Sequence, residues 1–273
     1  MMMPMILPFF YSEQHKPFDS LLDFHVHSGI LMRRKTRLGS NLDRSIAVGL
    51  SPLYSALSFK TRTSNVFIKG KLEPETFRTC FQLSAKNFSY ILNSRMDDGC
   101  LVEQQIRMQR GYQTAELSLS SNDYLLGIKG MLNKKFRNFW LQCGAETFFS
   151  PVKMSGGVGI LFNLSTITDT LSFVTNPIIG YFRCCYIKDW NFGQELIRMA
   201  TKYEYNIHSI ESDISWALQY KMEATSFKLR YSIEKGIGLF VKMSLSDILL
   251  RIGLAYDLRS MNQSFGIQIS NTQ

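Results

Sequence analysis

Hydrophobic and polar residues alternate with a period of two along residues 226–245. In the first half of this stretch, Phe227 and Leu229 alternate with Lys228 and Arg230. The pattern breaks at a Gly-Ile-Gly sequence and then resumes. Because successive side chains of a strand point to opposite faces, the stretch predicts two strands joined by a turn, each with an apolar and a polar face. The apolar face must lie against a protein core, a ligand or lipid.

Similar alternating stretches, separated by turn residues, recur along almost the whole chain. Examples are residues 44–51, 156–166 and 202–209, and only 4–15 and 191–200 show a helical spacing. A strand that crosses a bilayer needs about 9 to 11 residues. The chain therefore has room for about 18 or 19 such strands and for no further domain.

The residues on the polar face of each strand distinguish a membrane barrel from a soluble β-sandwich. In ISWALQY, Trp216 falls on the apolar face and Ala217 on the face of small and polar residues. A wide barrel directs apolar and aromatic residues toward lipid and small polar residues toward its lumen, whereas a sandwich buries the apolar phase between two sheets. The sequence thus predicts an all-β fold, a transmembrane β-barrel of about 19 strands over residues 21–273. The N-terminal segment 1–20 could form a short helix in the lumen.

Composition and charge further limit the classes of protein to which the chain can belong. The chain has 273 residues, of which 45% are hydrophobic and 19% charged, and no run approaches the roughly 18 apolar residues of a membrane-spanning helix. The net charge is +9. Most of the basic residues lie on the polar faces of the predicted strands, and this scatter favours solvated strand faces over a nucleic-acid site. Five cysteines, an odd number, favour free thiols. The apolar start lacks the basic leader and cleavage site of a secretory signal.

No motif in the chain predicts enzymatic chemistry. His25 and His27 share one face of a predicted strand without a third ligand nearby, so we expect no metal and no cofactor. The SGGVG sequence at 155–159 lacks the Lys-Ser/Thr of a phosphate-binding loop and predicts a hairpin turn. His208 and Ser209 are sequence neighbours that alternation sends to opposite faces, without a nucleophile elbow. The sequence therefore predicts a protein that is not an enzyme.

One stretch near the C-terminus resembles a targeting signal. RIGLAYDL lies within a predicted strand of residues 248–259 and carries polar Arg251, Gly253, and the hydrophobic residues Tyr256 and Leu258. This spacing resembles the β-signal by which mitochondrial outer-membrane barrels are passed to their insertion machinery. Such a strand can be recognised by pairing with a partner sheet, and glycine permits close approach of the backbone.

Five stretches, found in the same order along the chain, resemble segments of the mitochondrial distribution and morphology protein 10 family. The resemblance implies a VDAC-like barrel of about 19 strands, closed by a parallel first and last strand. The stretches are LLDFHVHSGI (21–30), LQCGAETFFSPVKMSGGVGI (141–160), LSFVTNPIIGYFRCCY (171–186), KYEYNIHSIESDISWALQY (202–220) and the closing FGIQIS.

The resemblance also implies a location and partners. The family anchors the ER–mitochondria encounter structure in the mitochondrial outer membrane, where its partners are lipid-transfer and membrane-anchor subunits. It also associates with the sorting and assembly machinery and promotes maturation of the import translocase. The expected role is therefore to support phospholipid exchange and mitochondrial morphology as a multi-pass barrel.

Three tyrosines occupy positions where the family carries aromatic residues that contact partners. They are Tyr54, Tyr203 and Tyr205, and Pro52 stands where the family pattern has a further aromatic residue. An aromatic girdle that contacts lipid is the alternative interpretation of Tyr203 and Tyr205.

Two other functions fit the same pattern of strands. One is a VDAC-type pore whose basic lumen passes anionic metabolites. The other is a soluble lipid-binding β-protein. Bilayer conductance of the reconstituted chain would favour the pore, and release by carbonate extraction would favour the soluble protein.

Overall fold

Within the described residues, the computed structural model has one helix and 19 strands. The described residues are 16–22, 29–38, 42–50, 53–73, 76–96, 100–121, 125–245 and 247–272. The helix and the first strands are α1 Lys16–Leu22, β1 Gly29–Leu38, β2 Leu42–Leu50, β3 Leu53–Arg62, β4 Val66–Leu72, β5 Phe77–Ala85, β6 Phe88–Met96, β7 Cys100–Arg110, β8 Gln113–Ser120 and β9 Leu126–Lys135. The remaining strands are β10 Trp140–Ser150, β11 Ser155–Ser165, β12 Asp169–Asn176, β13 Tyr181–Phe192, β14 Glu195–Asn206, β15 Glu211–Lys221, β16 Thr225–Ser232, β17 Gly236–Leu245, β18 Ile248–Tyr256 and β19 Gln263–Thr272.

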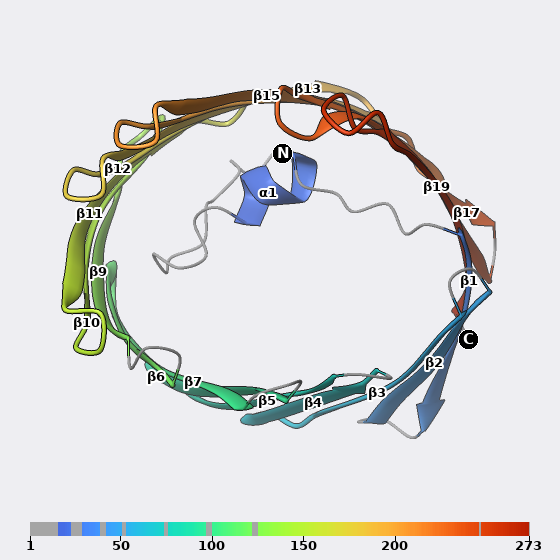
Figure 1. Ribbon diagram of the computed structural model, residues 1–273, viewed down its shortest axis with the longest axis horizontal. Helices are drawn as coiled ribbons and strands as arrows, with labels where there is room; N and C mark the ends of the chain where they lie inside the picture. Colours follow the sequence, from blue (N-terminus) through green and yellow to red (C-terminus); the bar gives the residue numbers. More distant parts are fainter. Residues whose placement is uncertain are drawn as a thin grey trace.

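The strands form a single sheet that closes on itself (Figure 1). Each strand pairs antiparallel with its neighbours in sequence, and β1 pairs parallel with β19 to complete the ring. The predicted all-β barrel of about 19 strands with a parallel closing pair is confirmed. A single closed sheet also contradicts the two packed sheets of a β-sandwich.

The spacing of apolar residues at 191–200 indicated a helix, and that prediction is wrong. These residues form the end of β13, a turn at Gly193 and the first half of β14. β14 pairs along its length with β13 on one side and with the whole of β15 on the other, so its backbone groups are satisfied by two neighbouring strands. That pairing outweighs a local spacing of apolar residues. The other helical spacing, at 4–15, lies outside the described residues.

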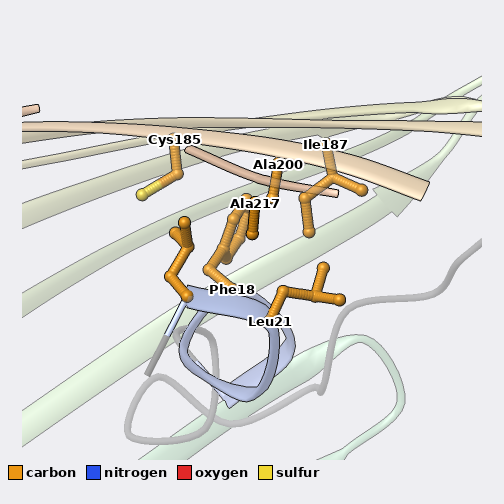
Figure 2. Close-up of a cluster of buried hydrophobic side chains, with 7 residues drawn as sticks. Phe18, Leu21, Cys185, Ile187, Ala200 and Ala217 are labelled. Carbon is orange, nitrogen blue, oxygen red and sulfur yellow. The ribbon is translucent and has the colours of Figure 1, made fainter. Parts of the chain in front are cut away.

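Helix α1 lies inside the ring, against the inner wall formed by β13 to β16 (Figure 1). Its apolar side chains pack on small and branched side chains of the wall, as Figure 2 shows. None of the described residues forms a helix long and apolar enough to cross a bilayer. The helix and the wall share one cluster of buried hydrophobic side chains, which consists of Phe18, Leu21, Leu22, Cys185, Ile187, Ala200 and Ala217.

Polar contacts fix the same helix to the wall. Arg183 donates to the carboxylate of Asp19 at 2.6 Å. Lys228 donates to the backbone carbonyl of Ser20 at 2.8 Å, and Arg230 donates to that of Leu22 at 3.4 Å. The contacts thus satisfy carbonyl groups at the end of a helix that is too short to be stable alone.

The position of α1 identifies the lumenal face of every strand. In β15, Ser215 and Ala217 are buried on the lumenal face, whereas Trp216 and Leu218 are exposed on the outer face. The same division holds along β11 and β13, where the buried positions alternate with exposed or half-buried ones. This arrangement, with apolar residues on the outside and polar residues on the inside, is the reverse of the arrangement in a soluble protein. The outer face is therefore suited to lipid, and the closed sheet satisfies its own backbone hydrogen bonds there.

Gly236 explains the glycine break in the stretch 226–245. It opens β17 with a φ of 72°, a conformation that glycine adopts without steric cost. A Cβ atom here would lie 2.0 Å from the backbone carbonyl oxygen of Tyr256. The turn between β16 and β17 therefore requires glycine for both its conformation and its close approach to β18.

Candidate functional site

Aromatic side chains cluster on the outer face where β12, β13 and β14 lie side by side. The rings of Phe173 and Phe182 are 4.9 Å apart, and those of Phe182 and Tyr203 are 6.1 Å apart, both edge to face. Tyr205 lies two positions along β14, opposite Phe182 on β13 and Ser212 on β15. We call these four residues, Phe173, Phe182, Tyr203 and Tyr205, the outer aromatic cluster. Edge-to-face geometry is the arrangement that aromatic pairs prefer.

The structure does not bring the third predicted tyrosine to this cluster. Tyr54 is the second residue of β3, and its backbone pairs with Gly49 of β2. By the shorter way round the ring, β2, β1, β19, β18, β17, β16 and β15 lie between β3 and β14. Tyr203 and Tyr205 thus form one surface, and Tyr54 belongs to a different part of the barrel.

The predicted β-signal occupies the next-to-last strand and the turn after it. Arg251, Gly253 and Tyr256 lie in β18, and β19 is the last strand. Leu258 lies beyond the strand, although the sequence had placed it inside a strand of residues 248–259. The guanidinium of Arg251 donates to the side chain of Gln268 in β19 at 3.2 Å.

Asp257 ends the strand at Tyr256, three residues earlier than expected. Its carboxylate accepts hydrogen bonds from the backbone N–H of Arg259 at 2.8 Å and from the hydroxyl of Ser260 at 2.7 Å. Aspartate favours turns because its side chain bonds the backbone two residues on. The Ser260 hydroxyl, together with the N–H groups of the turn, holds the pKa of Asp257 below its usual value.

Two features of the barrel were not apparent from the sequence. Gly253 of β18 pairs with Gly266 of β19, which in turn pairs with Gly29 of β1. Three glycines therefore lie in a row across the strands that close the ring. The second feature is the docking of α1 through Phe18. Glycines in the first strand and in the last two strands are a sequence signal for the first feature, but their alignment requires the register.

The described residues contain no cluster of three or more His, Cys, Asp or Glu side chains that could hold a metal ion. His25 and His27 lie outside the described residues. His208 lies in the turn between β14 and β15, with its ring nitrogen 3.4 Å from the carbonyl of Ile178. Its ring therefore contacts a neighbouring turn, and the backbone N–H of Ser209 bonds Asn206.

Opposite charges pair across neighbouring strands on one part of the lumenal wall. Arg198 donates to both oxygens of Asp189 at 2.6 and 2.5 Å. The Lys202 ammonium lies 2.7 Å from the carboxylate of Glu204 and 3.8 Å from that of Asp213. This part of the lumen, from β13 to β15, is thus close to neutral and is also the part that α1 covers.

The chain is similar to known proteins along most of the barrel. The sequence model of the family described as "Mitochondrial distribution and morphology protein 10" matches residues 70–235. A protein of that name from Zygosaccharomyces rouxii is 25% identical over 126 residues, which cover 40% of this chain and 28% of the relative. One from Debaryomyces hansenii is 23% identical over 189 residues, which cover 60% of this chain and 38% of the relative. The chain therefore matches less than two fifths of the length of each relative.

The family match coincides with particular parts of the barrel. It runs from β4 to the turn after β16 and so includes the outer aromatic cluster and the wall that binds α1. Tyr54 and the β-signal lie outside it. The match covers more than half of the chain and falls on a closed barrel with an apolar outer face. On this evidence the chain belongs to the mitochondrial distribution and morphology protein 10 family.

Proposed function

We propose that the chain is a mitochondrial outer-membrane barrel that anchors the ER–mitochondria encounter structure. In this role it holds lipid-transfer and membrane-anchor subunits at the membrane and so supports phospholipid exchange, mitochondrial distribution and mitochondrial morphology. We also propose that it associates with the sorting and assembly machinery during biogenesis of outer-membrane barrels and of the import translocase. The observation that carries the proposal is a closed barrel with an apolar outer face in a chain of this family.

The proposed mechanism is mechanical rather than enzymatic. The closed sheet can lie in hydrocarbon because its backbone groups pair within the sheet. Partners can then bind the rims or the outer face without any chemical step. The outer aromatic cluster suits such contacts, because Tyr203 is 39% exposed and the other three members are half-buried, and aromatic side chains are frequent binding hot spots.

Purification from intact membranes tests the anchor directly. A tagged chain, extracted from mitochondrial outer membrane in mild detergent, is expected to co-purify with encounter-structure subunits and with the sorting and assembly machinery. Carbonate extraction of the same membranes should leave the chain in the pellet. Recovery of the chain alone, from membranes in which both complexes are intact, contradicts the proposal.

Tyr203 and Tyr205 are expected to contribute to partner binding. Combined Tyr203→Ala and Tyr205→Ala substitutions should cost about 2 kcal/mol of binding free energy, or roughly 30-fold in Kd, if the pair acts as a hot spot. Quantitative mass spectrometry of the co-purified partners measures the loss. Tyr231→Ala is the matched control, because Tyr231 is an aromatic residue of the same outer face that contacts Trp216 at 6.2 Å between ring centroids. An equal loss in the control assigns both tyrosines to the lipid-facing girdle.

A metabolite pore is the second candidate function. It is favoured by cations at lumenal positions of β16, β17 and β18, namely Lys228, Lys242 and Arg251. Anion-selective conductance of the purified chain in planar bilayers, with no partners present, would support the pore.

A further inference from the structure

Cations lie directly opposite one another on the lumenal face of β3 to β6. In one row, Lys71 of β4 pairs with Arg78 of β5, and Arg78 pairs with Arg95 of β6. In the next row, Lys60 of β3 pairs with Lys69 of β4. Like charges directly opposite in an antiparallel sheet destabilise it. We call these five residues, Lys60, Lys69, Lys71, Arg78 and Arg95, the basic cluster.

A hollow in the lumenal wall lies over the basic cluster. Its volume is about 420 Å³, and four members of the basic cluster line it, the exception being Lys60. Asn93 and Cys80 line its centre, in the row between Lys69 and Glu103. The volume is within the range of about 300–1,000 Å³ that is usual for small-molecule sites. The hollow therefore has room for a ligand of several heavy atoms.

Two acidic side chains among the described residues lie close to the basic cluster. Glu73 contacts the Lys71 ammonium and lies 4.0 Å from the Arg78 guanidinium. Glu103 lines the far side of the hollow. Among the described residues of this region, five cations thus face two carboxylates, and the Arg78 side chain is 51% exposed. Positive charge is therefore in excess on the part of this wall that the structure describes.

The same wall shows a different arrangement elsewhere. Arg107 of β7 is directly opposite Glu116 of β8, with 3.5 Å between their charged groups. Lys129 of β9 is directly opposite Glu146 of β10, at 3.1 Å. Arg107 and Lys129 thus each have a carboxylate as a cross-strand neighbour. In β3 to β6, cations instead lie opposite cations in two neighbouring rows, and Lys242 and Arg251 do so in one row of β17 and β18. Such local conflicts are typical of functional sites.

We propose that the basic cluster binds a soluble compound that carries several phosphate groups. Two arginines supply planar forks that suit phosphate oxygens, and the lysines add point charges around them. The closed sheet separates the hollow from the bilayer, so the ligand comes from the aqueous lumen rather than from a lipid head group. The site goes beyond the proposed anchor, and it requires neither partner binding nor conduction.

Protection of Cys80 tests the site in the intact barrel. Cys80 is kept as the single cysteine by replacing Cys100, Cys143, Cys184 and Cys185 with serine, and the barrel is placed in nanodiscs of neutral lipid. Its labelling rate with an uncharged maleimide is measured with and without inorganic tripolyphosphate. The expected slowing is about tenfold when the tripolyphosphate concentration is about ten times its Kd. Sodium chloride at equal ionic strength should not slow the reaction.

Substitutions locate the bound anion. Combined Lys69→Gln and Arg78→Gln substitutions should abolish protection, and Arg95→Gln alone should weaken it. Combined Lys228→Gln and Lys242→Gln substitutions are the matched control, because they remove two lumenal cations from β16 and β17 and should leave protection unchanged. Each variant is first checked for barrel folding by its heat-dependent mobility shift in gels.

Three outcomes overturn the proposal. The first is an absence of protection in the parent protein, and the second is equal protection by sodium chloride. The third is an equal loss of protection in the control pair, which would reveal a diffuse lumenal field without a site. Nanodiscs of neutral lipid contain no partner proteins, so these outcomes leave the proposed anchor function unaffected.

Discussion

Trp216→Lys is expected to lower the free energy of unfolding of the barrel by about 2–4 kcal/mol, the cost of a lysine near the middle of the bilayer. Trp216 is the central residue of β15 and is 38% exposed on the outer face. The substitution also removes its contact with the Tyr231 ring. The folded fraction in lipid vesicles, followed against urea concentration by mobility in unheated gels, measures the change.

A lumenal lysine on the same strand is the control for this substitution. Gln219 lies on the lumenal face of β15 and donates to the Ser226 hydroxyl at 3.1 Å. Gln219→Lys should cost about 1 kcal/mol, the value of one hydrogen bond, because the new charge faces water. Ala217, the lumenal neighbour of Trp216, is unsuitable because it is 2% exposed beneath α1. Equal losses at Trp216 and Gln219 would contradict the assignment of the outer face to lipid.

The alternation of residues was sufficient to predict the barrel. A period of two assigns each residue to a face without knowledge of its neighbours, so the lipid-facing position of Trp216 could be inferred from ISWALQY alone. Strand ends were harder to predict. The hydrogen bonds of Asp257 end β18 before Leu258, and the apolar spacing at 191–200 continues across the turn at Gly193. Both errors arise where a few local contacts decide between strand and turn.

The candidate sites were predictable only in part, because they depend on the register between strands. Tyr203 and Tyr205 could be placed on one face of one strand, but their contact with Phe182 requires the pairing of β13 with β14. The stacking of Lys71 on Arg78 likewise depends on the length of the turn between β4 and β5. A shift of one residue in that turn would move one of the two side chains to the outer face.

Helix α1 was the least predictable part of the structure. It has seven residues, fewer than an isolated helix needs for stability in water. Its stability therefore comes from packing of Phe18, Leu21 and Leu22 on the lumenal wall, and residues distant in the sequence supply that wall. The sequence indicated a short helix within residues 1–20, whereas the described helix ends at Leu22.

Phe18→Ala is expected to weaken docking of α1 by about 3–5 kcal/mol, the usual cost of removing a buried phenylalanine side chain. Phe18 is fully buried, and Cys185 beneath the helix is 1% exposed. A thiol reagent in the lumen can reach Cys185 only when the helix undocks, so its labelling rate reports the undocked population when docking is fast. The rate should rise about a hundredfold or more in the variant. The measurement uses a chain in which Cys185 is the single cysteine.

Ser20→Ala separates the loss of packing from a general change in the helix. The Ser20 side chain is exposed. Its backbone carbonyl accepts a hydrogen bond from the Lys228 ammonium, and alanine at this position retains that hydrogen bond. Labelling of Cys185 should therefore stay at the parent rate in Ser20→Ala. The hydrogen bond from Arg183 to Asp19 remains in Phe18→Ala, so a hundredfold rise there would assign docking to apolar burial rather than to the ion pair. Rapid labelling of Cys185 in the parent chain would show instead that the wall beneath α1 is open to the lumen.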